Sequence, residues 1–288
     1  MNLFSSLSRW LKYKRWNRKK LEKFAQADVI LLRYPKSGVT WLRVMITQVY
    51  RARLDLPRSH LIGSRKFGAL AGAAPKIFVA MDNFGLPRDR FLKGIEGRKV
   101  VMLLRDPRDV VVSLYFHFAK RSTDFERTAF GIPDNIETAG MFAFVMNPAY
   151  GLPKIIDFMN FWSAALETHP QALVLRYEDL KADPVKEFTR VMSVVDAAAT
   201  AEEIRSAVDF AAFEKMKAME AEGSFGVDIL TPTDQSDQDS YKVRRGKVGG
   251  YVDYFSADEV KAIDTLVQNT LAPRLGYGQV AAAPAAAG

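Results

Sequence analysis

The run from Leu31 to Trp41 reads Leu-Leu-Arg-Tyr-Pro-Lys-Ser-Gly-Val-Thr-Trp and combines cations, hydroxyls and a glycine. Within it, Lys36 can neutralise an anion, and the hydroxyls of Ser37 and Thr40 can donate hydrogen bonds to the oxygens of that anion. Gly38 can bring the backbone close to a ligand because it has no side chain. These residue types predict a binding site for phosphate or sulfate.

The segments on either side of this run fit such a site. The apolar run Val29 to Leu32 precedes it and has the length of a buried strand, which Tyr34-Pro35 would end. After it, apolar residues recur with helical spacing at Trp41, Leu42, Met45 and Val49. A helix that begins near Gly38 would direct its N–H groups and the positive end of its dipole towards the loop, where they attract an anion.

Two further apolar runs also end in polar loops. Lys99 to Leu104 leads to Arg105, which can hold a phosphate through two hydrogen bonds, and to Ser113 two helical turns later. Ala172 to Leu175 leads to Tyr177 in the same way. Apolar strands that alternate with amphipathic helices are typical of a parallel sheet, whose ligands bind beyond the carboxyl ends of the strands. We therefore expect an α/β domain in which the three loops meet at one edge.

Composition limits the class of protein. The 288 residues are 48% hydrophobic and 26% charged, which suits one large domain over residues 25–278. The absence of cysteine excludes disulfides and thiolate metal sites, and the three histidines are too scattered to predict a metal cluster. Residues 1–23 hold eight basic residues and one Glu, which gives +7 of the total +8. A charge so concentrated at one end does not predict a nucleic-acid-binding fold.

Residues 1–24 form a basic segment that also contains aromatic and aliphatic side chains. Cations interleaved with apolar residues are typical of an amphipathic helix on an anionic membrane surface, and they also fit a solvated helix packed on the domain. The chain has neither the apolar stretch of a signal peptide nor an 18-residue apolar run. We expect a cytoplasmic protein, associated with a membrane if the basic segment binds lipid.

Three other segments depart from the regular alternation of strands and helices. Residues 120–152 mix turn residues with Phe, Met and Tyr, and we expect an insertion over the site. The polar residues 222–243 predict a mobile loop, and the Ala-rich residues 279–288 predict a disordered tail.

Five elements along the chain resemble, in the family order, the motifs of sulfotransferases that use 3′-phosphoadenosine 5′-phosphosulfate. Tyr34 to Leu42 is similar to the loop that binds the 5′-phosphosulfate, and Leu104 to Ser113 is similar to the motif that binds the 3′-phosphate. Tyr177 to Leu180 is similar to the Tyr-Glu-Asp segment, Phe213 to Lys217 to the Phe-x-x-Met-Lys segment, and Arg244 to Tyr251 to the C-terminal Arg-Lys-Gly element. The resemblance implies a P-loop-like three-layer fold with a central, mostly parallel sheet flanked by helices.

The same resemblance implies a reaction: in-line transfer of a sulfuryl group from this donor to an acceptor hydroxyl, without a metal ion. Lys36 would stabilise the bridging oxygen as its bond breaks, and Ser113 would restrain that lysine or the 3′-phosphate. Trp41 and Phe213 would enclose the adenine. The donor-binding residues that it implies are Lys36, Ser37, Gly38, Val39, Thr40, Trp41, Arg105, Ser113, Tyr177, Phe213, Arg244, Arg245 and Gly246.

The chain departs from the family at the general base. Where cytosolic members place Lys-Thr-His, this chain reads Ile-Phe-Val-Ala-Met-Asp-Asn-Phe over residues 77–84. Asp82 is the titratable side chain of that stretch and our candidate for the base, although an exposed carboxylate is a weak base near neutral pH. His117, one helical turn after Ser113, is the alternative. Two smaller departures are Val39 in place of the usual Thr, and Gly250-Tyr251 in place of Asp-Trp.

Two other functions stay open at this point. A P-loop kinase or NTPase is one, although the Gly-x-x-x-x-Gly-Lys-Ser/Thr order is absent and Lys36 precedes the single loop glycine. A non-catalytic nucleotide-binding protein at a membrane is the other. For a sulfotransferase, the acceptor would be a glycan, a glycolipid or a small alcohol, and the oligomeric state is open. The insertion favours an apolar or lipid-linked acceptor through Phe125, Phe130, Met141, Phe142, Phe144 and Tyr150.

Overall fold

The protein was analysed as a computed structural model, which describes residues 18–70, 72–81, 87–133, 135–225, 230–231, 234–237, 240–243 and 245–278. Its sheet contains four strands: β1 (Val29–Arg33), β2 (Ile77–Ala80), β3 (Lys99–Leu104) and β4 (Ala172–Arg176). The helices are α2 (Val39–Leu54), α3 (Arg65–Gly68), α4 (Arg88–Ile95), α5 (Pro107–Lys120), α6 (Asp124–Phe130), α7 (Ile136–Ala139), α8 (Met141–Met146), α9 (Leu152–Leu166), α10 (Tyr177–Ala182), α11 (Pro184–Val195), α12 (Ala201–Phe210), α13 (Phe213–Ala221) and α14 (Ala257–Thr270), with 3₁₀ turns η3 (Gly250–Tyr254) and η4 (Pro273–Leu275).

The four strands form a parallel sheet in the order β2-β1-β3-β4. Leu32 is in register with Ala80, Arg33 with Leu103, and Leu104 with Arg176, so all four carboxyl ends lie at one edge. The loops that follow the strands therefore meet there, which confirms the expected parallel α/β architecture. β2 adds a fourth strand to the three apolar runs seen in the sequence.

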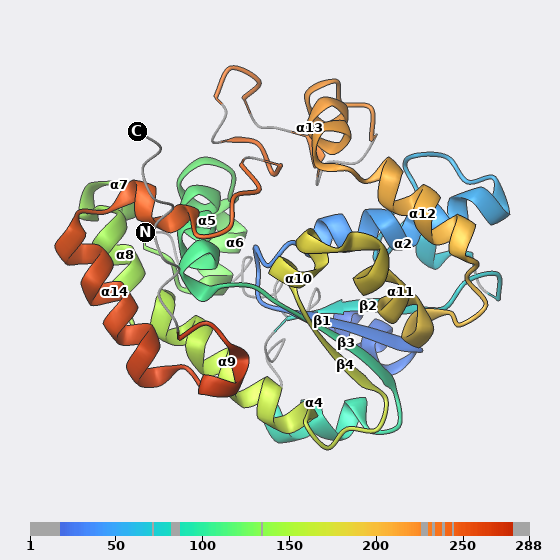
Figure 1. Ribbon diagram of the computed structural model, residues 1–288, viewed down its shortest axis with the longest axis horizontal. Helices are drawn as coiled ribbons and strands as arrows, with labels where there is room; N and C mark the ends of the chain where they lie inside the picture. The colour runs from blue at the N-terminus through green and yellow to red at the C-terminus, as the bar shows by residue number, and fades with distance from the viewer. Residues whose placement is uncertain are drawn as a thin grey trace, which may run out of the picture.

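The sheet is the middle of three layers, because alternate side chains of each strand point to opposite faces. Ile30 and Leu32 belong to the hydrophobic core on one face, and Val29 and Leu31 belong to the core on the other. Figure 1 shows α5, α8, α9 and α14 on the first side of the sheet and α2, α11 and α12 on the second. Both faces are covered, so the polar loops at the carboxyl edge are where this sheet can present functional groups.

The described part of the basic N-terminal segment packs on the domain. Residues 18–25 are helical, and the Phe24 ring stacks on Phe91 with ring centroids 4.7 Å apart and meets Phe78 edge-on at 5.6 Å. Arg98 donates a hydrogen bond of 3.1 Å to the carbonyl of Ala25. Residues 1–17 lie outside the described part of the chain, as does most of the proposed membrane-binding surface. In the described residues, every helix is too short or too polar to span a bilayer.

Candidate active site

A cleft of about 1030 Å³ opens at the carboxyl edge of the sheet. Many of the predicted donor-binding residues line it: Lys36, Gly38, Val39, Thr40, Trp41, Arg105, Ser113, Tyr177, Phe213, Arg245 and Gly246. Ser37 is buried in the loop itself, at 2% exposure. Asp82 and Arg244 lie outside the described residues. Five segments that are far apart in the sequence thus contribute to one cavity.

The first loop has the geometry of an anion-binding turn. Lys36 and Gly38 both have positive φ angles, 73° and 92°, on either side of Ser37. Such alternation turns successive N–H groups towards one side of the loop. Helix α2 starts directly after Gly38, with neither a side-chain cap nor an acidic residue in its first turn. The positive end of its dipole therefore faces the loop without a protein carboxylate to neutralise it.

At two positions of the site, a neighbouring aromatic ring leaves room for glycine but not for a residue with a side chain. A Cβ at Gly38 would lie 2.6 Å from the Tyr177 ring, and a Cβ at Gly246 would lie 2.5 Å from the Phe213 ring. Trp41 packs edge-on against Tyr177, with ring centroids 5.9 Å apart. The Tyr177 ring thus gives a second reason for glycine at position 38, besides the predicted close approach of a ligand.

Arg105 connects three of the predicted motifs. Its Nη1 donates to the Lys36 carbonyl at 3.5 Å, and its Nη2 donates to the Lys247 carbonyl at 3.2 Å. Its guanidinium lies over the Tyr177 ring, 4.5 Å from the centroid. The Nε of Arg105 is buried and has no hydrogen-bond partner among the described residues. A buried donor without an acceptor is costly, so this atom indicates an anion-binding position.

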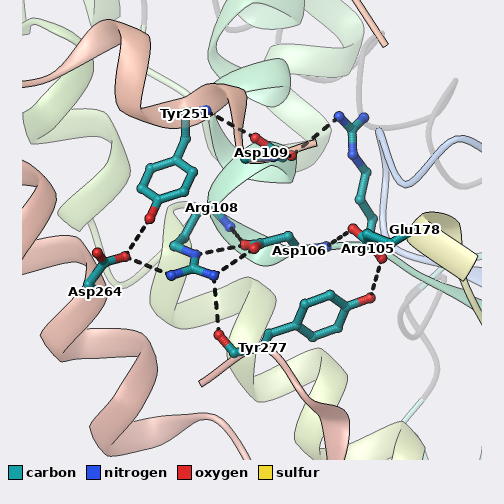
Figure 2. Close-up of polar contacts among 9 residues, drawn as sticks. Arg105, Asp106, Arg108, Asp109, Glu178, Tyr251, Asp264 and Tyr277 are labelled. Atoms are coloured by element: carbon teal, nitrogen blue, oxygen red, sulfur yellow. Dashed lines mark hydrogen bonds and ion pairs between the residues drawn. The ribbon is translucent and has the colours of Figure 1, made fainter. Parts of the chain in front are cut away.

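The C-terminal element is held against the same loop by Asp109, as Figure 2 shows. The Asp109 carboxylate is 3% exposed, accepts hydrogen bonds from the N–H groups of Gly249 (2.9 Å) and Tyr251 (3.0 Å), and lies 3.7 Å from Arg105. Burial raises the pKa of Asp109, and the neighbouring Asp106 adds to this, while Arg105 and the two N–H groups oppose it. This carboxylate positions the segment that carries Arg245, Gly246 and Lys247.

A buried network of hydrogen bonds and ion pairs holds the loop after β3 in place. The Arg108 guanidinium binds Asp106 and Asp264, each at 2.7 Å, and donates to the Tyr277 carbonyl at 3.2 Å. Glu178 accepts a hydrogen bond from the Asp106 N–H at 2.9 Å and another from the Tyr277 hydroxyl at 2.7 Å. The network joins the loops after β3 and β4 to the chain beyond α14, so the motifs that resemble family elements are mechanically connected.

Comparison with known proteins gives the family. A model of the family described as the sulfotransferase domain matches residues 89–274, which is more than half of the chain. The chain belongs to the sulfotransferase family. The matched region includes the second loop, the Tyr-Glu-Asp segment, α13 and the C-terminal element.

Curated relatives and solved structures agree with this assignment. The sulfotransferase is 28% identical to mouse Sulfotransferase 1B1, over 88% of this chain and 87% of the relative. It is 25% identical to Cytosolic sulfotransferase 14 of Arabidopsis thaliana, over 85% of this chain and 75% of the relative. Its fold is that of mouse sulfotransferase SULT7A1, whose structure was solved in complex with PAP, with a TM-score of 0.58 and 21% identity over 85% of this chain and 84% of that one. The protein is a transferase, and the kinase and non-catalytic alternatives are set aside.

The cleft of this sulfotransferase is also lined by four cations that were not predicted from the sequence: Lys20, Arg33, Arg43 and Lys242. Arg33 ends the first apolar run, which is a weak signal because many buried strands end in a charge. Lys242 is held in place by a residue distant in the sequence. The buried Glu220 carboxylate accepts hydrogen bonds from the backbone N–H groups of Lys242 and Val243, each at 2.7 Å. Nothing in the local sequence around these positions indicates that they share a cavity.

His117 also lines the cleft, 4.0 Å from Glu126. Burial, together with the nearby charges of Lys36, Lys242, Arg121 and Arg33, lowers the pKa of His117 to about 3. The imidazole is therefore neutral at pH 7, and in this state of the site it is a weak base.

The insertion contributes less to the cleft than its composition indicated. It folds into α6, α7 and α8, of which α6 supplies Phe125 and Phe130 to the wall. Phe144 is buried in the core instead, at 2% exposure. The other three side chains, Met141, Phe142 and Tyr150, pack against that core. Of the six side chains that the sequence indicated, Phe125 and Phe130 line the cleft.

Proposed function

We propose that this sulfotransferase moves a sulfuryl group from 3′-phosphoadenosine 5′-phosphosulfate to an acceptor hydroxyl, within a single domain over residues 25–278. The observation that carries the proposal is Arg105, whose buried and unpartnered Nε lies between the Lys36 loop and the Lys247 segment. A nucleotide with anionic groups at both ends needs cationic groups from both of these segments, and Arg105 contacts both. The PAP bound in the mouse SULT7A1 structure supports the same class of donor.

The residues fit this donor in chemical type. The turn at Lys36, Ser37, Gly38, Val39 and Thr40, with the start of α2, would hold the 5′-phosphosulfate. Arg105 and Ser113, together with Arg244, Arg245 and Gly246, would hold the 3′-phosphate. Arg245 binds Asp253 at 2.5 Å and the Tyr254 hydroxyl at 3.1 Å, so it would exchange these partners for the phosphate. Trp41, Tyr177 and Phe213 would hold the adenine.

The donor supplies an activated sulfuryl group, and the protein supplies position and charge. Lys36 would neutralise the charge that develops on the bridging oxygen, while Ser113 would restrain Lys36 or the 3′-phosphate. The acceptor hydroxyl must lose a proton during the transfer. Asp82 is our candidate for that base, and His117 is the alternative, because it faces the cleft.

The acceptor is proposed to be a hydroxyl of a glycan, a glycolipid or a small alcohol. We also propose that residues 1–23 bring the protein to an anionic membrane surface, where a lipid-linked acceptor would lie. The exposed cations Arg18, Lys19 and Lys23 support this, since they extend along a helix whose Phe24 is docked on the domain. Co-sedimentation with anionic liposomes tests it: equal binding with and without residues 1–23 would exclude the membrane role.

The transfer itself is tested with sulfur-labelled donor and a panel of hydroxyl acceptors. We expect label on an acceptor with the wild-type protein and a loss of about 100- to 1000-fold with Lys36→Ala, since one transition-state charge contact is worth about 3–4 kcal/mol. Asp82→Asn and His117→Gln identify the base by which of the two removes transfer at unchanged donor affinity. Transfer that survives in Lys36→Ala would contradict the assignment of the loop.

A further inference from the structure

Four further cations line the cleft besides the residues assigned to the donor, and the charge of Lys36 reaches one of them, Lys242. Arg33 ends β1, and Arg43 reaches Gly63, which packs against Val79 of β2. Arg105 instead follows β3, on the other side of β1 in the sheet order β2-β1-β3-β4. Lys20 and Lys242 line the cleft with Arg33 and Arg43. We call these four residues the distal cations.

The described residues provide no counter-charge for three of them. No described carboxylate forms an ion pair with Arg33, Arg43 or Lys242, and the Nε of Arg33 is buried without a hydrogen-bond partner. Arg43 Nε donates to the Ile62 carbonyl at 2.6 Å, which is a neutral acceptor. Three buried or partly buried cations that face one cavity without a carboxylate are unfavourable for a protein that binds nothing there.

The carboxylates that line the cleft are engaged elsewhere. Asp109 accepts the N–H groups of the C-terminal element, and Glu126 accepts the N–H of Thr123 at the start of α6. Asp209 forms an ion pair with Lys215 at 2.7 Å. Among the described residues, eleven Lys and Arg side chains and only these three carboxylates line the cleft.

The donor does not account for the distal cations. It carries about four negative charges, counting about two for the 3′-phosphate. At the donor end, the described cations Lys36, Arg105, Lys181, Arg245 and Lys247 line the cleft and can neutralise those charges. Burial lowers the pKa of Lys242 well below its ordinary value, and the charges of Lys36, Arg121, Arg33 and Arg43 lower it further. The distal cations therefore repel one another until an anion binds among them.

We propose that the acceptor carries an anionic group, such as a carboxylate, sulfate or phosphate, which Arg33, Arg43 and Lys242 bind while its hydroxyl faces Lys36. This inference rests on the proposed function and names the class of its acceptor. Two guanidinium groups suit a planar or tetrahedral oxyanion, because each can donate two parallel hydrogen bonds. Phe125 and Phe130 form an apolar wall of the same cleft, so the acceptor has an apolar part beside the anionic group.

The test uses pairs of acceptors in which a neutral carboxamide replaces the carboxylate: 4-hydroxybenzoate with 4-hydroxybenzamide, and phenyl glucuronide with phenyl glucuronamide. Label transfer gives kcat/KM for each compound. We expect the anionic member of each pair to be preferred by about 10- to 100-fold, the range for hydrogen bonds to a charged group. Arg33→Gln and Lys242→Gln should each reduce the preference to less than about 3-fold, and Arg33→Lys should restore part of it. Lys154→Gln is the control, because Lys154 is an exposed cation on the same cleft.

Binding is measured in parallel, so that a poor acceptor does not leave the question open. The protein is saturated with adenosine 3′,5′-bisphosphate and titrated with each compound. Tighter binding of the anionic members, lost in Arg33→Gln, supports the proposal. Equal binding within the pairs, or binding of no anionic member, overturns it. If the donor assignment is wrong, adenosine 3′,5′-bisphosphate itself does not bind. That result is distinguishable from failure of the acceptor proposal, in which the bisphosphate binds but the anionic compounds show no preference.

Discussion

Replacing Asp109 by Asn should detach the C-terminal element from the donor site. The carboxylate accepts two backbone N–H groups, at 2.9 and 3.0 Å, in a position that is 3% exposed. Asn keeps one acceptor oxygen but presents an NH₂ group to the second N–H, so at least one hydrogen bond to a charged group is lost. Such a bond contributes about 1.5–3 kcal/mol. Because Asp109 has a raised pKa, relief of its burial offsets part of this loss.

We therefore expect a loss of about 1–2 kcal/mol in the free energy of unfolding, measured by urea denaturation. The affinity for adenosine 3′,5′-bisphosphate should fall by about 10-fold or more, measured by titration calorimetry, since the carbonyl of Lys247 would no longer fix Arg105. The KM for the donor should rise, while kcat at saturating donor stays close to the wild-type value. That split distinguishes positioning of the segment from a part in the chemistry.

Asp253→Asn is the matched control, because Asp253 lies on the same element. Its exposed carboxylate pairs with Arg245 at 2.5 Å and Lys247 at 2.9 Å. Exposed pairs contribute about 0–1 kcal/mol, and removal of this one frees two cations for the donor. We expect unchanged or tighter donor binding. Equal effects of the two substitutions on donor binding would refute the role given to Asp109.

Two further predictions follow from the loop and the cleft wall. Gly38→Ala should lower the free energy of unfolding by about 2–4 kcal/mol and weaken donor binding, because the new Cβ meets the Tyr177 ring and the φ angle is 92°. Gly131→Ala is the control for the φ angle alone, because Gly131 has a φ of 67° and open space around it. Equal losses of stability in the two variants would show that the ring contact does not matter. His117 has a pKa of about 3 in the folded protein and about 6.5 when unfolded. The unfolded chain binds the extra proton between these values, so His117 destabilises the fold as pH falls below 6.5, by at most about 1.4 kcal/mol per pH unit. Urea midpoints at pH 7 and 5 should therefore differ less for His117→Gln than for the wild type, and an equal difference contradicts the burial of a neutral imidazole.

Strands β1 and β3 could be predicted from the sequence because they are buried on both faces. The run Lys99 to Leu104 coincides with β3, and Val29 to Leu32 falls one residue short of β1. In such strands nearly every residue is apolar, so the apolar run in the sequence has nearly the same bounds as the strand. β2 is half-exposed on alternate residues and only four residues long, so its apolar run gave a weaker signal.

The shared cleft of Lys36 and Arg105 could be predicted because both residues follow strands in short, local motifs. Lys36 and Arg105 each lie close to the end of a strand and the start of a helix, and strand order then brings them together. The distal cations could not be found in this way. Arg33, Arg43 and Lys242 come from a strand, a helix and a loop far along the chain, and only the folded chain shows that they share a cavity. For the same reason the composition of the insertion overstated its contribution to the acceptor wall.

Lys36, Arg105 and the 245–251 segment are assigned to one site for a nucleotide with a 3′-phosphate. Titration calorimetry with adenosine 3′,5′-bisphosphate and adenosine 5′-monophosphate tests this assignment most directly. We expect the bisphosphate to bind at least about 100-fold more tightly, and Arg105→Gln to remove most of this difference, since a bidentate contact between charged groups contributes about 3 kcal/mol. Equal affinities for the two nucleotides, or an undiminished preference in Arg105→Gln, would contradict it.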